Sequence, residues 1–466
     1  MTARTLTVTA PYDGSAIAPV PVAGAAEAED ALSTAAALHR DRDRWLGLPE
    51  RLAVLRRAAE IMAEEAETLA VNAAREGGKP LIDSRVEVAR AIDCLHICVE
   101  TMRTEAGAVI PMDVNGASAG RIAMTRREPI GVVVAVSAFN HPLNLIAHQV
   151  APAVAAGCPV IVKPSEDTPL SCLRFVQILH EAGLPAEWCR ALVIEDLSVA
   201  EALVTDPRVG FFSFIGSARV GWHLRSKLAP GTRCALEHGG AAPVILAQDA
   251  NQEAAMTSIL KGGFYHAGQV CVSVQRVFAD RGIARTFAEQ LAAAAAELTV
   301  GDPTEAATDV GPLIRPREVT RVAKWVDEAV DAGAELLTGG KALSEYCYAP
   351  TVLYDPPGDV RVSTAEVFGP VVAVYPYDDL DDALTRANSL EYAFQAAVFT
   401  QDIDTAMHAF SQLDASAVMV NDHTAFRVDW MPFAGLKQSG LGVGGIPHTL
   451  RDMQTEKMLL VRSPGL

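Results

Sequence analysis

Short apolar segments alternate with helical segments from Pro129 onward, and this alternation constrains the fold more than any other feature of the sequence. Strands are expected at 132–136, 159–163, 191–194 and 211–215, with helices over 143–156 and 169–182 between them. The expected strands are unbroken runs rich in β-branched residues, which indicates burial on both faces of a sheet. Because helices separate them, the sequence predicts a parallel, doubly wound α/β sheet.

A second α/β block is expected from about residue 239 to residue 420. Its strands are expected at 243–246, 275–279, 371–375, 395–400 and 417–421, and its clearest helices at 253–266 and 284–298. Before the first block, residues 25–102 have a helical pattern that is broken at 77–80 by two glycines and a proline. Segments 121–127 and 455–462 look like exposed strands outside both blocks. A chain of 466 residues with this organisation should form two or three domains.

Composition argues against several classes of protein. The formal net charge of −18 disfavours a nucleic-acid-binding protein, which needs a basic face. The longest apolar runs are strand-sized, and residues 1–20 lack the pattern of a secretion signal, so we expect no membrane span and a cytoplasmic protein. The eight cysteines are then expected to be free thiols. Cys94 and Cys98 lack a second pair of ligands nearby, so we interpret them as helix core residues and expect no metal site.

Two glycine-containing segments are candidates for binding phosphate. Residues 440–445 match the pattern G-x-G-x-x-G, but Pro447 follows almost at once and the chain is too short for the βαβ unit that this motif opens. We therefore interpret 440–445 as a flexible loop. Gly216 and Ser217 are better candidates because they lie where a strand is expected to end and a helix to begin, and free amides at a helix start favour phosphate. By itself this second signal is weak.

Four side chains lie at junctions between the expected elements. Cys271, in Gly-Gln-Val-Cys, is a possible nucleophile, although a lone cysteine is more often a buried core residue. Glu237 precedes a double glycine and is either a general base or an exposed turn carboxylate. Asn140 either donates its amide to an oxyanion or caps the next helix. Lys163 ends a strand where ligands often bind, but alone it would be interpreted as a polar turn residue.

Together these segments resemble the aldehyde dehydrogenase superfamily over nearly the whole chain. Seven motifs occur in the order that the family shows: Phe-Asn-x-Pro from Phe139, Lys-Pro-Ser-Glu from Lys163, Phe-x-Gly-Ser ending at Ser217, Glu-x-Gly-Gly from Glu237, Gly-Gln-x-Cys ending at Cys271, Glu-x-Phe-Gly-Pro from Glu366 and Pro-Phe-x-Gly-x-Lys-x-Ser-Gly from Pro432. The resemblance implies an α/β fold with a Rossmann-type NAD-binding domain (1–238), a catalytic domain (239–425) and a return of 426–466 to the first domain. Residues 115–128 and the C-terminal strand would form an oligomerisation arm, and because strand edges need partners, a homodimer or homotetramer is expected.

The resemblance also implies the role of each motif residue. Cys271 would attack the aldehyde carbonyl as a thiolate, with Asn140 stabilising the oxyanion. Hydride would then pass to the nicotinamide, and Glu237 would activate the water that hydrolyses the thioester. Lys163 is implied both in catalysis and in binding the adenosine ribose. The other implied cofactor contacts are Phe139, Ser165, Glu166, Gly216, Ser217, Glu366 and Phe368.

Glu166 favours NAD as the cofactor. A carboxylate accepts hydrogen bonds from both ribose hydroxyls and repels a 2′-phosphate. Lys163 could still tolerate NADP, so NADP stays possible as the cofactor.

The segment Phe426-Arg427-Val-Asp429 before Met-Pro is similar to the lactaldehyde and phosphonoacetaldehyde dehydrogenase-like branch of the family. Members of that branch take small aldehydes that are often hydroxylated or anionic, so Phe426 and Arg427 are candidate substrate contacts. Arg427 either holds an anionic group of the substrate or pairs with Asp429 to brace the loop, and we favour the pairing.

Val270 argues against a phosphorylated substrate because an apolar residue beside the nucleophile cannot neutralise a dianion. His141 and Arg90 are the possible substitute cations. His238 and Ala434 depart from the residues usual in the family, and both changes concern the shape of the pocket and not a group that does chemistry.

Three other functions stay open at this point. A coenzyme A-acylating aldehyde dehydrogenase would release the thioester to coenzyme A, and the presence of Glu237 favours hydrolysis instead. A scaffold without activity would not need Cys271, Glu237 and Asn140 together. A thiol hydrolase acting through Cys271 would leave the cofactor residues without a role.

Overall fold

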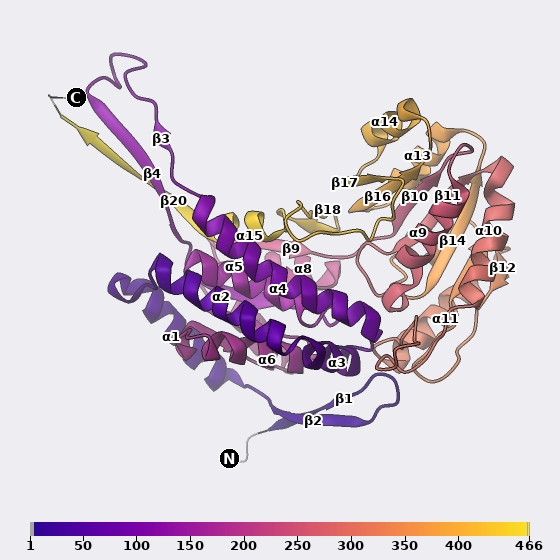
Figure 1. The fold of residues 1–466 in the computed structure, drawn as a ribbon, viewed down its shortest axis with the longest axis horizontal. Helices are drawn as coiled ribbons and strands as arrows, with labels where there is room; N and C mark the ends of the chain where they lie inside the picture. The colour runs from indigo at the N-terminus through magenta and orange to yellow at the C-terminus, as the bar shows by residue number, and fades with distance from the viewer. Residues whose placement is uncertain (1–3, 464, 466) are drawn as a thin grey trace.

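A computed structural model describes residues 4–463 and 465 of the chain. Figure 1 shows two α/β lobes beside each other and a long β-ribbon, formed by β4 and β20, that projects from the first lobe. The predicted α/β fold is confirmed, because each lobe is built on its own, mostly parallel sheet. No helix among the described residues is both long enough and apolar enough to cross a membrane.

The first lobe contains a six-stranded sheet in the order β19-β9-β8-β5-β6-β7, in which β19 is antiparallel to β9 and the other neighbours are parallel. Val133 and Ala135 of β5 pack among helices α2 to α6, while Val132 and Val134 face α1 and α7. The sheet is therefore covered on both faces, as its apolar strands predict. Its strands are β5 (Val132–Val136), β6 (Val160–Lys163), β7 (Cys189–Ala191), β8 (Val209–Ile215), β9 (Arg233–Glu237) and β19 (Gly440–Leu441). Its helices are α1 (Ala25–Arg40), α2 (Leu48–Glu64), α3 (Ala66–Gly77), α4 (Leu81–Thr104), α5 (Asn144–Ala156), α6 (Pro169–Glu181), α7 (Leu197–Thr205), α8 (Ala218–Arg225) and α15 (Ile446–Asp452).

The second lobe contains a seven-stranded sheet in the order β12-β13-β14-β11-β10-β16-β17, in which β12 is antiparallel to β13. Its core is one continuous apolar cluster between this sheet and its helices. Its strands are β10 (Ala242–Leu246), β11 (Val274–Asp280), β12 (Glu335–Thr338), β13 (Thr351–Tyr354), β14 (Val371–Tyr377), β16 (Gln395–Phe399) and β17 (Ala417–Val420). Its helices are α9 (Gln252–Phe264), α10 (Arg281–Ala296), α11 (Pro316–Asp331), α12 (Arg361–Thr364), α13 (Leu380–Asn388) and α14 (Ile403–Gln412).

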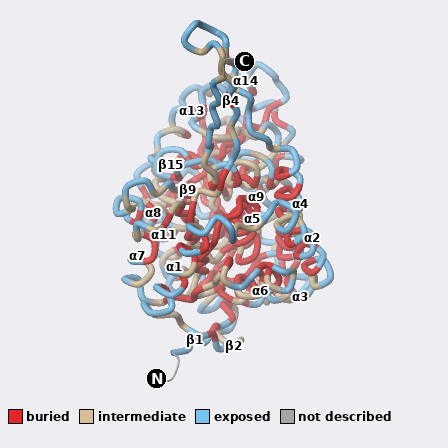
Figure 2. The backbone as a smooth tube through the Cα atoms, turned by 90° about the vertical axis from the view of Figure 1, so that its left-hand side faces the viewer, coloured by how far each residue is buried: buried red, intermediate tan, exposed pale blue. Residues whose placement is uncertain are grey.

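The projecting ribbon is a three-stranded sheet of β3 (Val109–Ile110), β4 (Arg121–Pro129) and β20 (Gln454–Arg462). β4 and β20 pair antiparallel along their full length, so the two segments that look like exposed strands in the sequence meet each other. Figure 2 shows the ribbon as mostly exposed, in contrast to the buried interior of the body. Smaller sheets pair β1 (Thr5–Thr9) with β2 (Ala16–Pro21) and β15 (Tyr392–Ala393) with β18 (Leu436–Lys437).

The chain passes between the two large sheets twice, from β9 to β10 and again between β17 and β19. The boundaries that we propose for the domains, 238/239 and 425/426, fall in these connections. The eight cysteines are free, as expected, and Cys94 and Cys98 are fully buried in α4.

Three expectations from the sequence are wrong in detail. Residues 440–445 are not simply a flexible loop, because Gly440 and Leu441 form the edge strand β19 beside Glu237 and Leu236. The strand expected at 191–194 lies at 189–191, directly after a short 3-10 turn. The helix expected to reach residue 266 ends at Phe264, because the next turn takes a left-handed conformation.

Candidate active site

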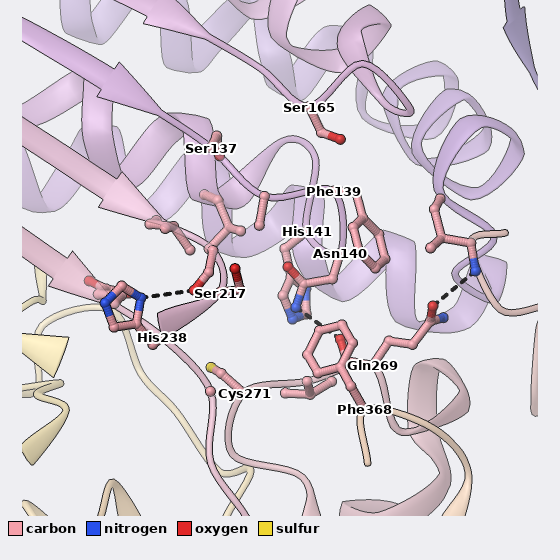
Figure 3. A pocket seen from close by; sticks show the side chains of 18 of the residues that line it. Ser137, Phe139, Asn140, His141, Ser165, Ser217, His238, Gln269, Cys271 and Phe368 are labelled. Carbon is pink, nitrogen blue, oxygen red and sulfur yellow. Dashed lines mark hydrogen bonds between the residues drawn. The ribbon is translucent and has the colours of Figure 1, made fainter. Parts of the chain in front are cut away.

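The carboxyl ends of β5, β6, β8 and β9 meet at one edge of the first sheet because these strands are parallel. Asn140, Glu166 and Ser217 follow three of these ends, and Glu237 closes β9. A cavity of about 970 Å³ opens there, and Cys271 reaches it from the second lobe. Figure 3 shows Cys271, Asn140, His141 and Ser217 among the residues that line this cavity.

Most of the residues singled out in the sequence line this one cavity. They are Phe139, Asn140, His141, Ser165, Glu166, Gly216, Ser217, Glu237, Val270, Cys271, Glu366, Phe368 and Arg427. Lys163 and Phe426 are not among the lining residues. Lys163 is buried behind the wall, where its ammonium group donates to Glu166 (2.6 Å) and to the Pro164 carbonyl (3.1 Å). Phe426 is exposed.

A strained turn holds the segment that carries Cys271. His266, Ala267 and Gly268 have φ values of 50°, 52° and 68°, a left-handed run that non-glycine residues rarely adopt. A Cβ atom on Gly268 would lie 2.1 Å from the Gly369 carbonyl oxygen, so only glycine fits there. The turn ends α9 early and leaves Cys271 three residues before β11, at the lobe boundary.

The side chain of Asn140 is directed at this segment and does not cap a helix. Its Nδ2 donates to the Gln269 carbonyl oxygen at 2.9 Å. The amides of Leu143 and Asn144 at the start of α5 instead donate to the Glu87 carboxylate, at 2.9 Å each. An amide nitrogen carries two hydrogens, so Asn140 has a second N–H available for an oxyanion formed near Cys271.

Burial raises the pKa of the two candidate reacting groups, Cys271 and Glu237. It raises the pKa of the Cys271 thiol to about 12, and the nearby Glu237 carboxylate adds to the effect. Burial also raises the pKa of Glu237, against the opposing charge of Arg427. A Cβ atom on Gly444 would lie 2.3 Å from Glu237 Oε1, so the glycine makes room for this carboxylate. Cys271 is therefore a thiol at neutral pH in the free protein, with a carboxylate of raised basicity beside it.

The opposite end of the cavity fits a nicotinamide dinucleotide. Gly216 and Ser217 precede α8, whose first amides suit a diphosphate, and Arg219 in its first turn also lines the cavity. Glu166, held by Lys163, presents a carboxylate suited to ribose hydroxyls. His238 donates from Nδ1 to the Gly216 carbonyl (2.9 Å) and so braces this turn.

A second pair of residues suits the nicotinamide end. The Glu366 carboxylate accepts the Gly240 amide at 3.2 Å, and burial raises its pKa to about 7. A Cβ on Gly239 would overlap this carboxylate, so the double glycine after Glu237 creates its space. Phe368 packs edge-on against Phe139, with ring centres 5.9 Å apart.

The predicted pairing of Arg427 with Asp429 is wrong. Asp429 instead accepts two hydrogen bonds from Arg90, at 2.6 and 3.1 Å, and one from His148 at 2.7 Å. Arg427 Nη2 contacts the other nitrogen of His148 at 3.3 Å. Loop residues two apart point in different directions here, so proximity in sequence did not make them partners. Cys94, His148 and Asp429 lie within 4.8 Å of one another, but the two adjoining guanidinium groups oppose a metal cation.

His141 and Arg90 do not supply a free positive charge for the substrate. Burial and the neighbouring Lys79 ammonium hold the pKa of His141 well below its usual value, so its ring is neutral. Lys79 Nζ lies 2.6 Å from His141 Nδ1 and is itself paired with Glu87. Arg90 is paired with Asp429.

Several residues of the site were not predicted from the sequence. Arg219 follows Ser217 by two residues, so the glycine–serine turn before α8 is the signal that could have identified it. Arg315 forms an ion pair with Asp167 (2.6 Å) across the cofactor end, and Trp325 of α11 lines the same region. Tyr265 lines the substrate end. These residues come from segments with ordinary helical or loop patterns.

The model of the aldehyde dehydrogenase family matches residues 1–459. A 3-sulfolactaldehyde dehydrogenase from Priestia aryabhattai is 38% identical over 412 residues, which cover 88% of this chain and 86% of the relative. A lactaldehyde dehydrogenase from Methanocaldococcus jannaschii is 35% identical over 455 residues, 97% and 96% of the two chains.

Solved structures of aldehyde dehydrogenases have the same fold as this chain. Aldehyde dehydrogenase 21 from Physcomitrella patens, in complex with the reaction product succinate, has a TM-score of 0.95 and 35% identity, covering 100% of this chain and 96% of that one. Glyceraldehyde-3-phosphate dehydrogenase from Methanocaldococcus jannaschii, in complex with NADP, has a TM-score of 0.94 and 34% identity, covering 99% and 100%. The chain therefore belongs to the aldehyde dehydrogenase family and is an NAD(P)-dependent oxidoreductase that acts on an aldehyde.

Proposed function

We propose that this protein oxidises a small aldehyde of the lactaldehyde type to its carboxylic acid, through a thioester on Cys271 that is hydrolysed with Glu237 as general base. The observation that carries the proposal is the convergence of Asn140, Glu237 and Cys271 on one cavity whose other end fits a dinucleotide. The names of the relatives, which include lactaldehyde and 3-sulfolactaldehyde dehydrogenases, support a small substrate.

Each residue has a separate task. The Cys271 thiol releases its proton to solvent, its sulfur bonds to the aldehyde carbon, and the free N–H of Asn140 donates to the carbonyl oxygen that becomes negative. A bound nicotinamide dinucleotide supplies a hydride acceptor. Glu237 then takes a proton from the water that cleaves the thioester and returns Cys271 to its thiol form. The raised pKa of Glu237 increases its basicity for this step.

We further propose that NAD is used more efficiently than NADP. Glu166 lines the cavity and its charge would repel a 2′-phosphate. Lys163 partly compensates that charge, and Arg315 is engaged with Asp167. The expected result is a higher kcat/KM with NAD, measured at a fixed saturating aldehyde. A ratio in favour of NADP would contradict the proposal.

A screen of NADH formation over small aldehydes tests the activity. Wild-type protein should oxidise several of them, and Cys271→Ala should abolish turnover. The acid should be the product, and added coenzyme A should not be acylated. Acyl-coenzyme A formation would favour the acylating alternative, and turnover by Cys271→Ala would exclude the covalent route.

We also propose that the protein is a homodimer or homotetramer assembled through the ribbon. β20 exposes Met458, Leu459, Leu460 and Val461, and β4 exposes Ile122 and Met124. The helix α14, which packs on β16 next to the edge strand β17, carries a second exposed apolar stripe of Ile403, Met407 and Phe410. An open strand edge and apolar surfaces of this kind are suited to a second copy of the chain.

A further inference from the structure

The substrate end of the cavity contains one arginine, Arg427, that has no carboxylate at salt-bridge distance among the described residues. Arg427 lines the cavity and forms no ion pair with any residue of the described part of the chain. Its only hydrogen-bond partner there is His148, and its Nε is buried without a partner. An unpaired buried donor of this kind is costly unless a ligand satisfies it.

His148 meets Arg427 as a neutral ring. Burial, followed by the charge of Arg427, lowers the pKa of His148 to about 4. One ring nitrogen donates to Asp429 at 2.7 Å, so the other accepts from Arg427 at 3.3 Å. The Arg427 guanidinium also lies 3.6 Å from the centre of the Phe433 ring. These contacts fix the guanidinium in place without neutralising it.

The other cations on this side are already compensated. Arg90 is paired with Asp429, Lys79 with Glu87, and the His141 ring is neutral. Val270 adds an apolar wall beside the nucleophile. The substrate end therefore offers one guanidinium group, that of Arg427, without a salt-bridge partner among the described residues.

We propose that Arg427 binds an anionic group of the substrate, so that the natural substrate is a short aldehyde with a single negative charge, a carboxylate or a sulfonate. This inference rests on the proposed function and names its substrate class. Arg427 lines the same cavity as Cys271 and Glu237, which supports a short spacing between the anion and the aldehyde carbon. A phosphate or phosphonate dianion would leave one charge uncompensated in a largely apolar cavity, which is unfavourable.

Aldehydes of matched shape test the charge requirement. Sulfoacetaldehyde is a monoanion, phosphonoacetaldehyde a dianion above its second pKa, and 3,3-dimethylbutanal a neutral analogue of the same shape. Succinate semialdehyde and 4-methylpentanal form a second pair, with a carboxylate and without. At pH 8 the wild-type kcat/KM should be highest for a monoanion in each set. Comparing kcat/KM for sulfoacetaldehyde with kcat/KM for succinate semialdehyde then decides whether the site prefers a sulfonate or a carboxylate.

Variants of Arg427 assign the effect to that residue. Arg427→Gln should lower kcat/KM for the monoanions by about 30- to 1000-fold, the cost of removing one partner of a buried charge pair, and mainly through KM. Because Arg427 also acts on Cys271 and Glu237, the readout is the ratio of kcat/KM for a monoanion to that for its neutral analogue, which should fall by at least about tenfold. Arg427→Lys should keep part of the preference. Arg281→Gln, which removes an exposed arginine paired with Asp378, is the control and should keep the wild-type ratio.

Two negative results are distinguishable. If wild-type protein oxidises the neutral and anionic analogues equally through Cys271, the charge inference is wrong and the proposed function stands. If it oxidises none of the aldehydes, the proposed function is wrong. The wild-type comparison needs no variant, so a poorly folded Arg427→Gln protein would not leave the inference untested.

Discussion

The side-chain amide of Asn140 donates a 2.9 Å hydrogen bond to the backbone carbonyl of Gln269, two residues before Cys271. The Gln269 side chain is in turn bonded to the Pro312 carbonyl (3.1 Å) and to the Ile314 amide (3.0 Å). One side chain from the first lobe is thus fixed against the segment of the second lobe that carries the proposed nucleophile, Cys271. This contact orients the second N–H of Asn140 and links it to the position of Cys271.

Substitution of Asn140 should therefore affect chemistry more than binding. In Asn140→Ala and Asn140→Asp we expect kcat to fall by about 100- to 1000-fold, the usual cost of losing an oxyanion donor. The dissociation constant for NADH should stay within about threefold, because the amide is proposed to act on the oxyanion. Steady-state kinetics and NADH fluorescence titration measure the two quantities. A variant with nearly unchanged kcat would exclude Asn140 from the oxyanion site.

The pKa of Cys271 makes alkylation strongly pH-dependent. Burial raises this pKa to about 12, which disfavours the thiolate, so the reactive fraction grows about tenfold for each pH unit below that value. In the free protein we expect the iodoacetamide rate at Cys271, followed by peptide mass spectrometry, to rise with this slope from pH 7 to pH 10. A plateau near pH 8 would show that the thiol has a much lower pKa.

Local sequence identified the parts of the site that lie at strand ends. Asn140, Glu166, Ser217 and Glu237 come together because parallel strands place their carboxyl ends at one sheet edge, a consequence of the alternating pattern. The resemblance of these segments to aldehyde dehydrogenase motifs then implied a role for each residue. Segments 121–127 and 455–462 were expected to be exposed strands outside both blocks, but their pairing with each other as β4 and β20 was not predicted.

Contacts between distant segments were not accessible in the same way. Arg427 and Asp429 are two residues apart, and local reasoning paired them, yet Asp429 binds Arg90 from a helix more than 300 residues earlier. The edge strand at Gly440 depends on its neighbour Glu237, which no local pattern reveals. Left-handed residues at His266 and Ala267 are likewise held by the surrounding structure, because their own preferences oppose this conformation.

Assembly through the ribbon predicts a mass that depends on its apolar face. Static light scattering should give two or four times the chain mass of 49.4 kDa. Met458→Asp with Leu460→Asp places two charges on alternate, exposed positions of β20 and should shift the mass towards a single chain. Leu197→Asp introduces one such charge at an exposed leucine of α7, outside the ribbon, and should leave the mass unchanged.

Loss of the Glu237 carboxylate should separate the two halves of the reaction. In Glu237→Gln we expect a burst of NADH of at most one equivalent per site, followed by a steady-state rate lower by about 100- to 10,000-fold, the usual contribution of a general base. Rapid mixing measures the burst, and mass spectrometry of the quenched protein should find the acyl group on Cys271. Full steady-state turnover would assign the base to another residue.

Gly444 offers an independent test of the position of Glu237. A Cβ atom there would lie 2.3 Å from Glu237 Oε1 and 2.9 Å from the Phe433 carbonyl oxygen. The backbones of Gly444 and Phe433 form two hydrogen bonds with each other, which hold Gly444 in place. The Glu237 side chain must therefore move when alanine is introduced at residue 444. A displacement near 1 Å at a catalytic group can cost about 100-fold in rate. Gly444→Ala should therefore slow thioester hydrolysis and reproduce the burst of Glu237→Gln.

The matched control is Gly358→Ala, because nothing lies within 4 Å of a Cβ atom at that exposed position. It should retain wild-type kinetics. If Gly444→Ala instead lowers the burst and the steady-state rate equally, the substitution disturbs the attack by Cys271 or the fold, and a thermal unfolding curve distinguishes these two. Wild-type kinetics in Gly444→Ala would mean that Glu237 acts from a rotamer directed away from Gly444.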